Sequence, residues 1–202
     1  MSRLIVDYFT KLQRHYKVLE KTRQKVEYLF NKKLLTKTEV EQTYGTLFTN
    51  AVIGFEHFIE ELFFDLLTDR LKYNKIKPLV IFKNESIAYN IILGTNSYIN
   101  WLPYDYTERY ADIYFKEGLP FKSITPQDKT MLKKASYIRN ALVHRSRFSY
   151  SKYEKNVLCN LPLASKEKSP EKFLRGIFTT PSKTRFEIYV EEIASIAQKI
   201  CT

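Results

Sequence analysis

The residues best suited to chemistry in this chain lie in one short segment, Arg139-Asn140-Ala141-Leu142-Val143-His144. If the segment is helical, it brings a guanidinium, an amide and an imidazole within about 8 Å of each other along the helix axis. An imidazole transfers protons in both directions near neutral pH, and a guanidinium stabilises negative charge on phosphate oxygens. These are the groups needed to cleave RNA without a metal ion.

The same residues also have a purely structural interpretation. Arginine and histidine near the C-terminus of a helix interact well with the helix dipole and with the last carbonyl groups. The segment taken alone therefore leaves both interpretations open.

A helical projection of the segment and its upstream neighbours predicts one apolar face, which consists of Met131, Leu132, Ala135, Ile138, Leu142 and Val143. Arg139 lies at the edge of this face and needs a partner, because burying an unpaired guanidinium costs several kcal/mol. Glu56 lies at the border of the apolar face of an earlier helix, and we expect it to be the structural partner of Arg139.

The opposite face of the projection carries Asn140 and His144, one turn apart, so the amide can orient either the imidazole or a phosphate. Basic and aromatic residues on this face and just downstream are candidates for gripping an RNA backbone or stacking on unpaired bases. The candidate RNA-binding residues are Lys133, Tyr137, Arg145, Arg147 and Tyr150, with Tyr153 as a further stacking residue.

Apolar residues spaced three and four apart predict an all-α bundle of about five main helices. The expected ranges are 3–33, 36–72, 105 or 107 to 117, 125–147 and 185–201. Capping residues support two of the starts: Thr36 with Glu39, and Thr125 followed by Pro126. We expect residues 1–202 to form a single domain, with an irregular insert at about 73–104 that is either a short helix or extended. A second insert, a basic loop at about 148–184, follows the motif helix and can contain a short helix opened by Ser169-Pro170.

The net charge of +11 is concentrated in two segments, with +6 in residues 1–36 and +8 in residues 139–185. A positive field of this kind attracts polyanions, so a nucleic acid is the expected partner. The alternative is a basic surface that serves solubility only.

The two cysteines, Cys159 and Cys201, fit neither a zinc site nor a disulfide framework. The N-terminal residues reach Asp7 too early for a signal peptide, and the uncharged run 42–55 is too short to span a membrane. We therefore expect a cytoplasmic protein without a membrane segment. The sequence indicates no metal site and no cofactor, because it contains no glycine-rich phosphate loop, and because the acidic residues around His57 spread over a wide arc.

The Arg139–His144 motif resembles that of the HEPN superfamily, in which an arginine precedes a histidine by four to six residues, often with Asn after the arginine. Two further stretches are similar to stand-alone bacterial HEPN ribonucleases: Gly54-Phe55-Glu56-His57-Phe58-Ile59-Glu60 in an early core helix, and Arg185-Phe186-Glu187-Ile188-Tyr189-Val190 at the start of the closing helix. The likeness covers roughly residues 40–72 and 126–200 and leaves out the insert at 73–104.

The resemblance implies a HEPN-like bundle and a metal-independent endoribonuclease that acts as a homodimer, with a composite active site between two protomers. His144 would be the general acid or base, Arg139 would stabilise the transition state, and Asn140 would orient phosphate or histidine. Such proteins act as toxins or in antiphage defence, which implies a possible antitoxin or defence-system partner. Some HEPN toxins carry a modified tyrosine two residues after the histidine; Ser146 stands there in this chain, so the resemblance does not extend to that control.

Two other classes remain open at this point. A non-catalytic HEPN-like helical module would use the same basic face to bind RNA, a nucleotide or a protein. A helical DNA-binding protein ranks last, because no helix-turn-helix pair with an exposed basic recognition helix is visible.

Overall fold

The computed structural model describes residues 4–71, 78–159, 161–164, 167–178 and 182–202. The helices among them are α1 (Ile5–Asn31), α2 (Lys37–Leu67), α3 (Glu85–Leu93), α4 (Asp105–Tyr114), α5 (Pro126–His144), α6 (Arg147–Tyr153), α7 (Pro170–Arg175) and α8 (Arg185–Ile200). Short 3-10 turns occupy Lys116–Gly118 and Phe121–Ser123, a π-helical turn occupies Glu154–Leu158, and strands β1 (Ile177–Phe178) and β2 (Lys183–Thr184) pair antiparallel. The predicted all-α character is confirmed.

The five predicted main helices correspond to α1, α2, α4, α5 and α8. Capping boxes at Thr36–Glu39 and Thr125–Asp128 begin α2 and α5. In each, the threonine hydroxyl accepts a hydrogen bond from a backbone N–H of the first turn, which has no acceptor inside the helix. A third capping box, Thr184–Glu187, opens α8. Local sequence therefore fixes where the long helices begin.

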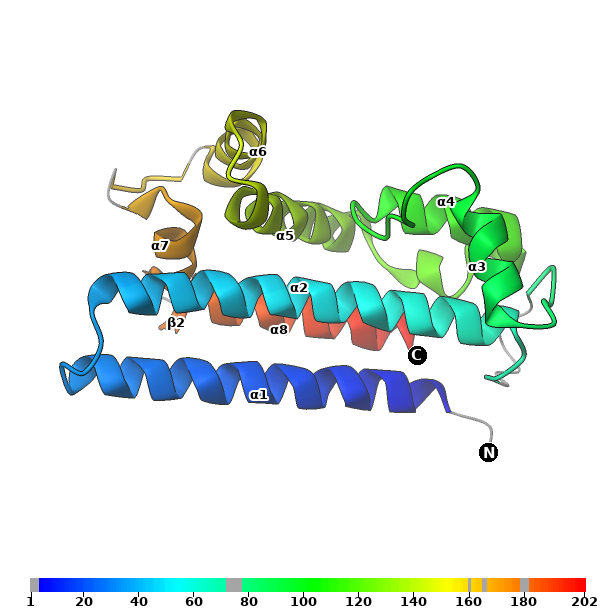
Figure 1. Cartoon of the computed structure of the whole chain (residues 1–202), viewed down its shortest axis with the longest axis horizontal. Helices are drawn as coiled ribbons and strands as arrows, with labels where there is room; N and C mark the ends of the chain where they lie inside the picture. The colour runs from blue at the N-terminus through cyan, green and yellow to red at the C-terminus, as the bar shows by residue number, and fades with distance from the viewer. Residues whose placement is uncertain (1–3, 72–77, 160, 165–166, 179–181) are drawn as a thin grey trace.

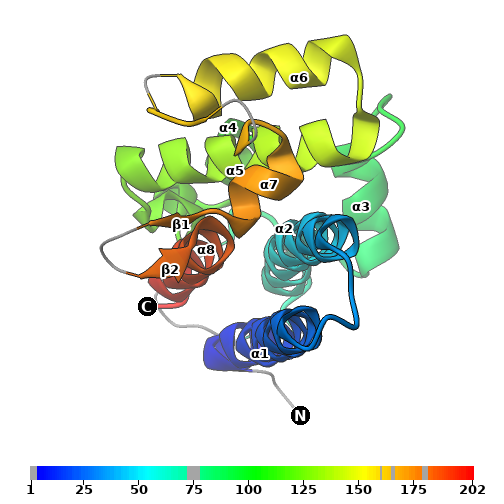
Figure 2. The same cartoon turned by 90° about the vertical axis from the view of Figure 1, so that its left-hand side faces the viewer.

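The long helices α1 and α2 lie side by side, and α8 packs against both of them and against α5 (Figure 1). Figure 2 shows that α5 and α6 run across this group, with α6 in the outermost layer. The motif helix α5 thus rests on α2 and α8.

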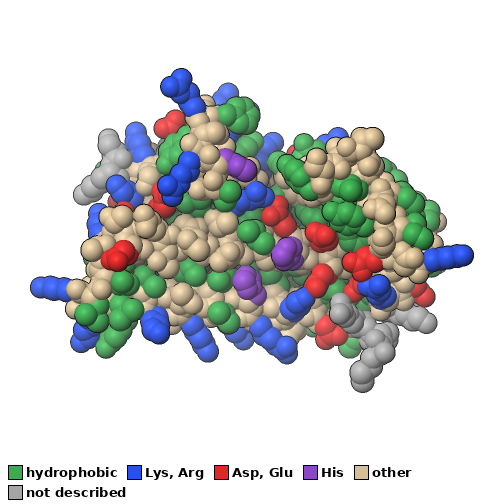
Figure 3. Space-filling view, in the orientation of Figure 1, with side chains coloured by type: hydrophobic (Ala, Val, Ile, Leu, Met, Phe, Trp, Pro, Cys, Tyr) green, Lys and Arg blue, Asp and Glu red, His purple; other side chains and the backbone are tan. Residues whose placement is uncertain are grey.

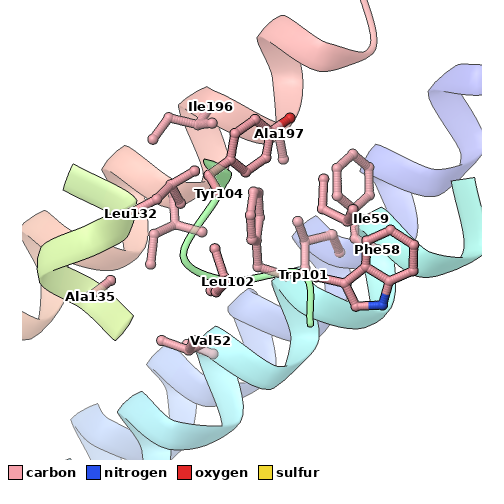
Figure 4. Close-up of a cluster of buried hydrophobic side chains, with 14 of the residues drawn as sticks. Val52, Phe58, Ile59, Trp101, Leu102, Tyr104, Leu132, Ala135, Ile196 and Ala197 are labelled. Carbon is pink, nitrogen blue, oxygen red and sulfur yellow. The ribbon is translucent and has the colours of Figure 1, made fainter. Parts of the chain in front are cut away.

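The core is built around α2, whose aromatic and aliphatic side chains meet those of every other layer. Figure 4 shows part of it: Val52, Phe58 and Ile59 from α2, Leu132 and Ala135 from α5, Ile196 and Ala197 from α8, and Trp101, Leu102 and Tyr104 from the segment before α4. Removing this apolar surface from water is the main stabilising term of such a fold. The burial of Trp101, Leu102 and Tyr104 also fixes the end of the insert to the core beside the motif helix.

Glycine 45 lets α2 approach α5 and α7 closely. A Cβ at Gly45 would lie 2.9 Å from Leu142 Cδ2 on α5 and 3.2 Å from Glu171 Cγ on α7. A larger residue at Gly45 would force the side chains of Leu142 and Glu171 to shift. The close contact holds the motif segment against the central helix.

Two predicted helix ends are wrong. The second helix ends at Leu67 rather than near Lys72, because Asp69 adopts a left-handed backbone conformation (φ 55°). The motif helix ends at His144 rather than near Arg147, because Arg145 is left-handed (φ 45°) and Ser146 then caps a new helix, α6, by accepting from the Ser149 amide at 3.1 Å. The histidine is thus the last residue of its helix.

The helix predicted to run to Glu117 ends earlier, at Tyr114. Thr107, one of its two candidate caps, lies inside the helix and donates its hydroxyl to the Trp101 carbonyl at 2.7 Å. Gly118 has a positive φ of 69° but closes a 3-10 turn rather than α4.

The segments expected to be irregular contain more structure than the sequence suggested. Residues 148–184, expected as a basic loop, contain most of α6, the π-helical turn, α7 opened by Ser169, and the β1–β2 pair. The insert at 73–104 contains α3, capped by Asn84, and a non-helical stretch at 94–104; its residues 73–77 lie outside the described residues. Within the described ranges, none of the helices combines the length and apolar character needed to cross a bilayer.

Candidate functional site

The central contact of the site joins α5 to α2. Arg139 Nη2 donates to Glu56 Oε1 at 2.7 Å, and each side chain is 20% exposed. Glu56 is the residue that the sequence analysis predicts as the structural partner of Arg139. Burial raises the pKa of Glu56, and the neighbouring Arg139 guanidinium, which lowers the pKa, offsets this only in part.

The guanidinium of Arg139 keeps spare hydrogen-bonding capacity. Its Nε is buried and has no acceptor among the described residues. A buried N–H without an acceptor costs free energy, and the other N–H donors of the guanidinium lie on its terminal nitrogens. The pair with Glu56 therefore fixes the guanidinium without using all of its donors.

Arg139, Asn140 and His144 line one hollow of about 360 Å³, which we call the motif hollow. Its wall on α2 is formed by Ile53, Glu56, His57 and Glu60, and its wall on the insert by Tyr98, Ile99, Asn100, Trp101 and Leu102. Trp101 Nε1 donates to Glu60 Oε2 at 3.0 Å, which ties the insert to α2. The three motif residues thus share one concave surface with a second histidine.

His144 is exposed at the end of α5, and no hydrogen bond within the described residues involves it. Asn140 lies one turn earlier on the same face and is half-buried. An exposed, unpaired imidazole at the rim of a hollow is accessible to a ligand.

The other residues predicted to contact RNA lie outside the motif hollow. Lys133 is exposed near the start of α5, and Tyr137 and Tyr150 are half-buried against the core. Arg147 is exposed at the start of α6. Arg145 faces a neighbouring hollow, 3.9 Å from Glu171.

Two residues differ from their predicted environments. Tyr153 is fully buried, so it is not available to stack on a base. Val143, expected on the apolar face, is 52% exposed, because the α5 core contact at this level is made by Ala141 and Leu142 instead. Phe148, just downstream, is 72% exposed. Together Val143 and Phe148 place apolar surface on either side of His144 in the sequence.

Sequence reasoning missed His57 and the insert wall. In the sequence, His57 stands among acidic residues that spread over a wide arc of their helix, and only the packing of α5 on α2 brings it to the hollow that contains Arg139. Figure 3 shows that all three histidines of the chain lie on one face of the molecule. The signal available in the sequence was the adjacency of His57 to Glu56, the expected partner of Arg139.

The described residues include no group of three or more His, Cys, Asp or Glu side chains arranged to hold a metal ion. Comparisons of the chain with family models, with curated proteins and with solved structures find no match. The functional argument therefore rests on the residues of the motif hollow and their chemistry.

Proposed function

We propose that this protein is a metal-independent endoribonuclease of the HEPN type, acting in toxin or antiphage defence. The observation that carries the proposal is the convergence of Arg139, Asn140 and His144 on one hollow, with Arg139 fixed by Glu56. A cation, an amide and an accessible imidazole around one cavity suit a phosphodiester and its neighbouring ribose.

In the proposed reaction, His144 takes the proton of the ribose 2′-hydroxyl. The 2′-oxygen then forms a bond to the adjacent phosphorus, and the bond from phosphorus to the 5′-oxygen breaks. Arg139 stabilises the negative charge on the non-bridging oxygens, and Asn140 orients the phosphate. The products are a 2′,3′-cyclic phosphate and a 5′-hydroxyl.

The departing 5′-oxygen must gain a proton, and we assign its donation to His57 in the protonated form. His57 is the other imidazole that lines the motif hollow. Proton transfer by a positioned side chain contributes roughly 10²- to 10⁴-fold to a rate, so this second group has a measurable share of catalysis.

We further propose that the protein works as a homodimer in which two motif hollows face each other. The exposed side chains of Val143 and Phe148 beside His144 support this arrangement, since apolar surface at a functional rim marks interaction sites. A second copy would cover the hollow and lower its dielectric, which strengthens the Arg139–phosphate interaction.

A binding module without catalysis is the competing function, and one observation favours it. Glu56 neutralises Arg139 and, together with Glu60, adds negative charge to the hollow that would hold the phosphate. A protein that only binds RNA, a nucleotide or a protein partner tolerates this arrangement, because it has no transition-state charge to stabilise.

Cleavage in the presence of a chelator separates the two functions. The purified chain is incubated with single-stranded RNA in EDTA, and the new ends are analysed. Ends with 2′,3′-cyclic phosphate and 5′-hydroxyl support the ribonuclease, whereas RNA that is bound and left intact supports the binding module. Ends with 3′-hydroxyl would contradict the proposed mechanism, because attack by the 2′-hydroxyl cannot produce them.

A further inference from the structure

Helix α1 carries a line of cations on its outer face, which we call the basic stripe and define as Lys11, Arg14, Lys21 and Lys25. These positions lie on one side of a helix, with the exposed Val18 between them. The buried residues of α1, such as Leu12 and Leu19, lie on a different side of the helix. Figure 3 shows Lys and Arg side chains along the edge of the molecule that α1 forms.

The basic stripe is largely unneutralised. Lys11 pairs with Glu61 at 2.6 Å, but none of the ion pairs within the described residues involves Arg14, Lys21 or Lys25. The glutamates of α1 are engaged elsewhere, since Glu20 pairs with Arg23 and Glu27 with Arg175. The cations of the stripe are thus available to an external polyanion.

A second hollow, of about 490 Å³, lies between α1 and α2 and adjoins the motif hollow. We call it the α1–α2 hollow. It shares Ile53, His57 and Glu60 with the motif hollow, and on its α1 side it reaches Lys11 of the basic stripe. One continuous surface therefore leads from His144 past His57 to α1.

The lining of the α1–α2 hollow suits a nucleobase better than a phosphate. The exposed Ile53 supplies apolar surface over a lining that includes the buried Leu12, Phe58 and Phe64, and His15 supplies an aromatic ring. The carboxylates that line it, Glu60, Glu61 and Glu85, repel phosphate but can accept hydrogen bonds from the amino groups of bases. A base enters such a hollow only when it is unpaired, because a duplex keeps its bases stacked inside.

We infer that the α1–α2 hollow and the basic stripe form an extended binding track for single-stranded RNA. A base of the strand that occupies the motif hollow enters the α1–α2 hollow, and the following phosphates lie along the stripe. This inference rests on the proposed function for the identity of the motif hollow, but it makes its own prediction about how strand length and salt affect binding.

The first experiment measures binding without cleavage. The probe is a labelled 20-nucleotide single-stranded RNA of mixed sequence with every 2′-hydroxyl methylated, which blocks attack on phosphorus. The Arg14→Glu/Lys21→Glu variant should bind about tenfold more weakly at 0.1 M salt, and the slope of log K against log salt should fall by about 1.4 for two lost phosphate contacts. The Lys83→Glu/Lys116→Glu variant has the same change in net charge at exposed positions outside both hollows, and it should bind like the parent.

The second experiment uses strand length. For a cleavable 20-nucleotide RNA, the Arg14→Glu/Lys21→Glu variant should show a raised KM and an unchanged kcat. For a trinucleotide, which is too short to reach the stripe, the variant and the parent should have the same KM. A merely structural effect of the substitutions would change both substrates alike.

The outcomes separate this inference from the proposed function. If the parent cleaves no RNA but the stripe variant loses binding to the methylated strand, the nuclease proposal fails and the track is supported. If the two double variants bind the strand equally, or if a duplex of the same sequence binds as well as the single strand, the track is wrong. Loss of binding to anionic phospholipid vesicles with unchanged RNA binding would instead assign the stripe to a membrane surface and would overturn the inference.

Discussion

Arg139 and Glu56 are 83 positions apart in the chain, yet their side chains meet at 2.7 Å between α5 and α2. The contact fixes the Arg139 guanidinium in the motif hollow and links α5 to α2. It has a structural role and, in the proposed mechanism, a catalytic one, and substitution can separate the two.

Replacing Glu56 with alanine should lower the free energy of unfolding by about 1–3 kcal/mol, because it leaves a mostly buried guanidinium without its acceptor. The charge-swapped double variant Glu56→Arg/Arg139→Glu should recover part of this stability in urea denaturation. Its cleavage activity should stay lost, because a carboxylate then occupies the position of the catalytic cation. Cleavage by the swapped variant at the parent rate would show that Arg139 acts only in the fold.

Replacing His144 with alanine should reduce RNA cleavage by at least about 100-fold while RNA binding and the thermal midpoint stay unchanged. The side chain is exposed and makes no hydrogen bond within the described residues, so its removal leaves the packing intact. Cleavage is measured from the rate of appearance of cyclic phosphate ends. Ser86→Ala, an exposed substitution on α3, is the control; equal rates for the two variants would rule out His144 as the general base.

Replacing His57 with alanine should slow cleavage of ordinary RNA by about 100-fold. On RNA whose scissile 5′-oxygen is replaced by sulfur, the same variant should recover most of the parent rate, because a thiolate leaves without a proton donor. His144→Ala should show no such recovery, since its lost step is the activation of the 2′-hydroxyl. If the sulfur substrate fails to rescue His57→Ala, the proton reaches the 5′-oxygen from another group.

Charged substitutions at the exposed apolar residues beside the motif should disrupt the proposed dimer. Val143→Asp/Phe148→Asp should have the molar mass of a monomer by light scattering and should lose cleavage activity, whereas the parent should have the molar mass of a dimer. Ile113→Asp changes a similarly exposed apolar residue on α4 and should leave the dimer intact. A parent that is monomeric and fully active would contradict the dimer proposal.

The link between α5 and α8 should make stability depend on acid pH. Burial raises the pKa of Asp128, but the bonds from Lys199 at 2.8 Å and from Thr125 outweigh it and hold the pKa below the ordinary value of 3.8. A lowered folded-state pKa adds stability above about pH 4 that is lost as the pH falls through the folded value. Asp128→Asn should therefore be less stable than the parent at pH 7, and urea denaturation should show the difference shrinking below pH 4; a constant difference down to pH 2 would contradict this assignment.

Sequence patterns were reliable for the helices that carry their own signals. Thr36, Thr125 and Thr184 each begin a helix because a hydroxyl and a nearby carboxylate satisfy its first amides. Ser146 is an equally local signal, because its hydroxyl caps α6. The break between α5 and α6 is harder to predict, because the left-handed residue that makes it is Arg145 rather than a glycine.

The sequence by itself determined that the chain is helical, which helix carries the motif, and that Arg139 would need a partner, because these follow from spacing along one chain. The tertiary structure alone decided which surfaces face each other. His57 reaches the motif hollow because α5 packs on α2, and Trp101 is held at the hollow by its hydrogen bond to Glu60, 41 positions away. Such tertiary contacts depend on how side chains of distant segments pack together, and the periodicity within one segment does not predict that packing.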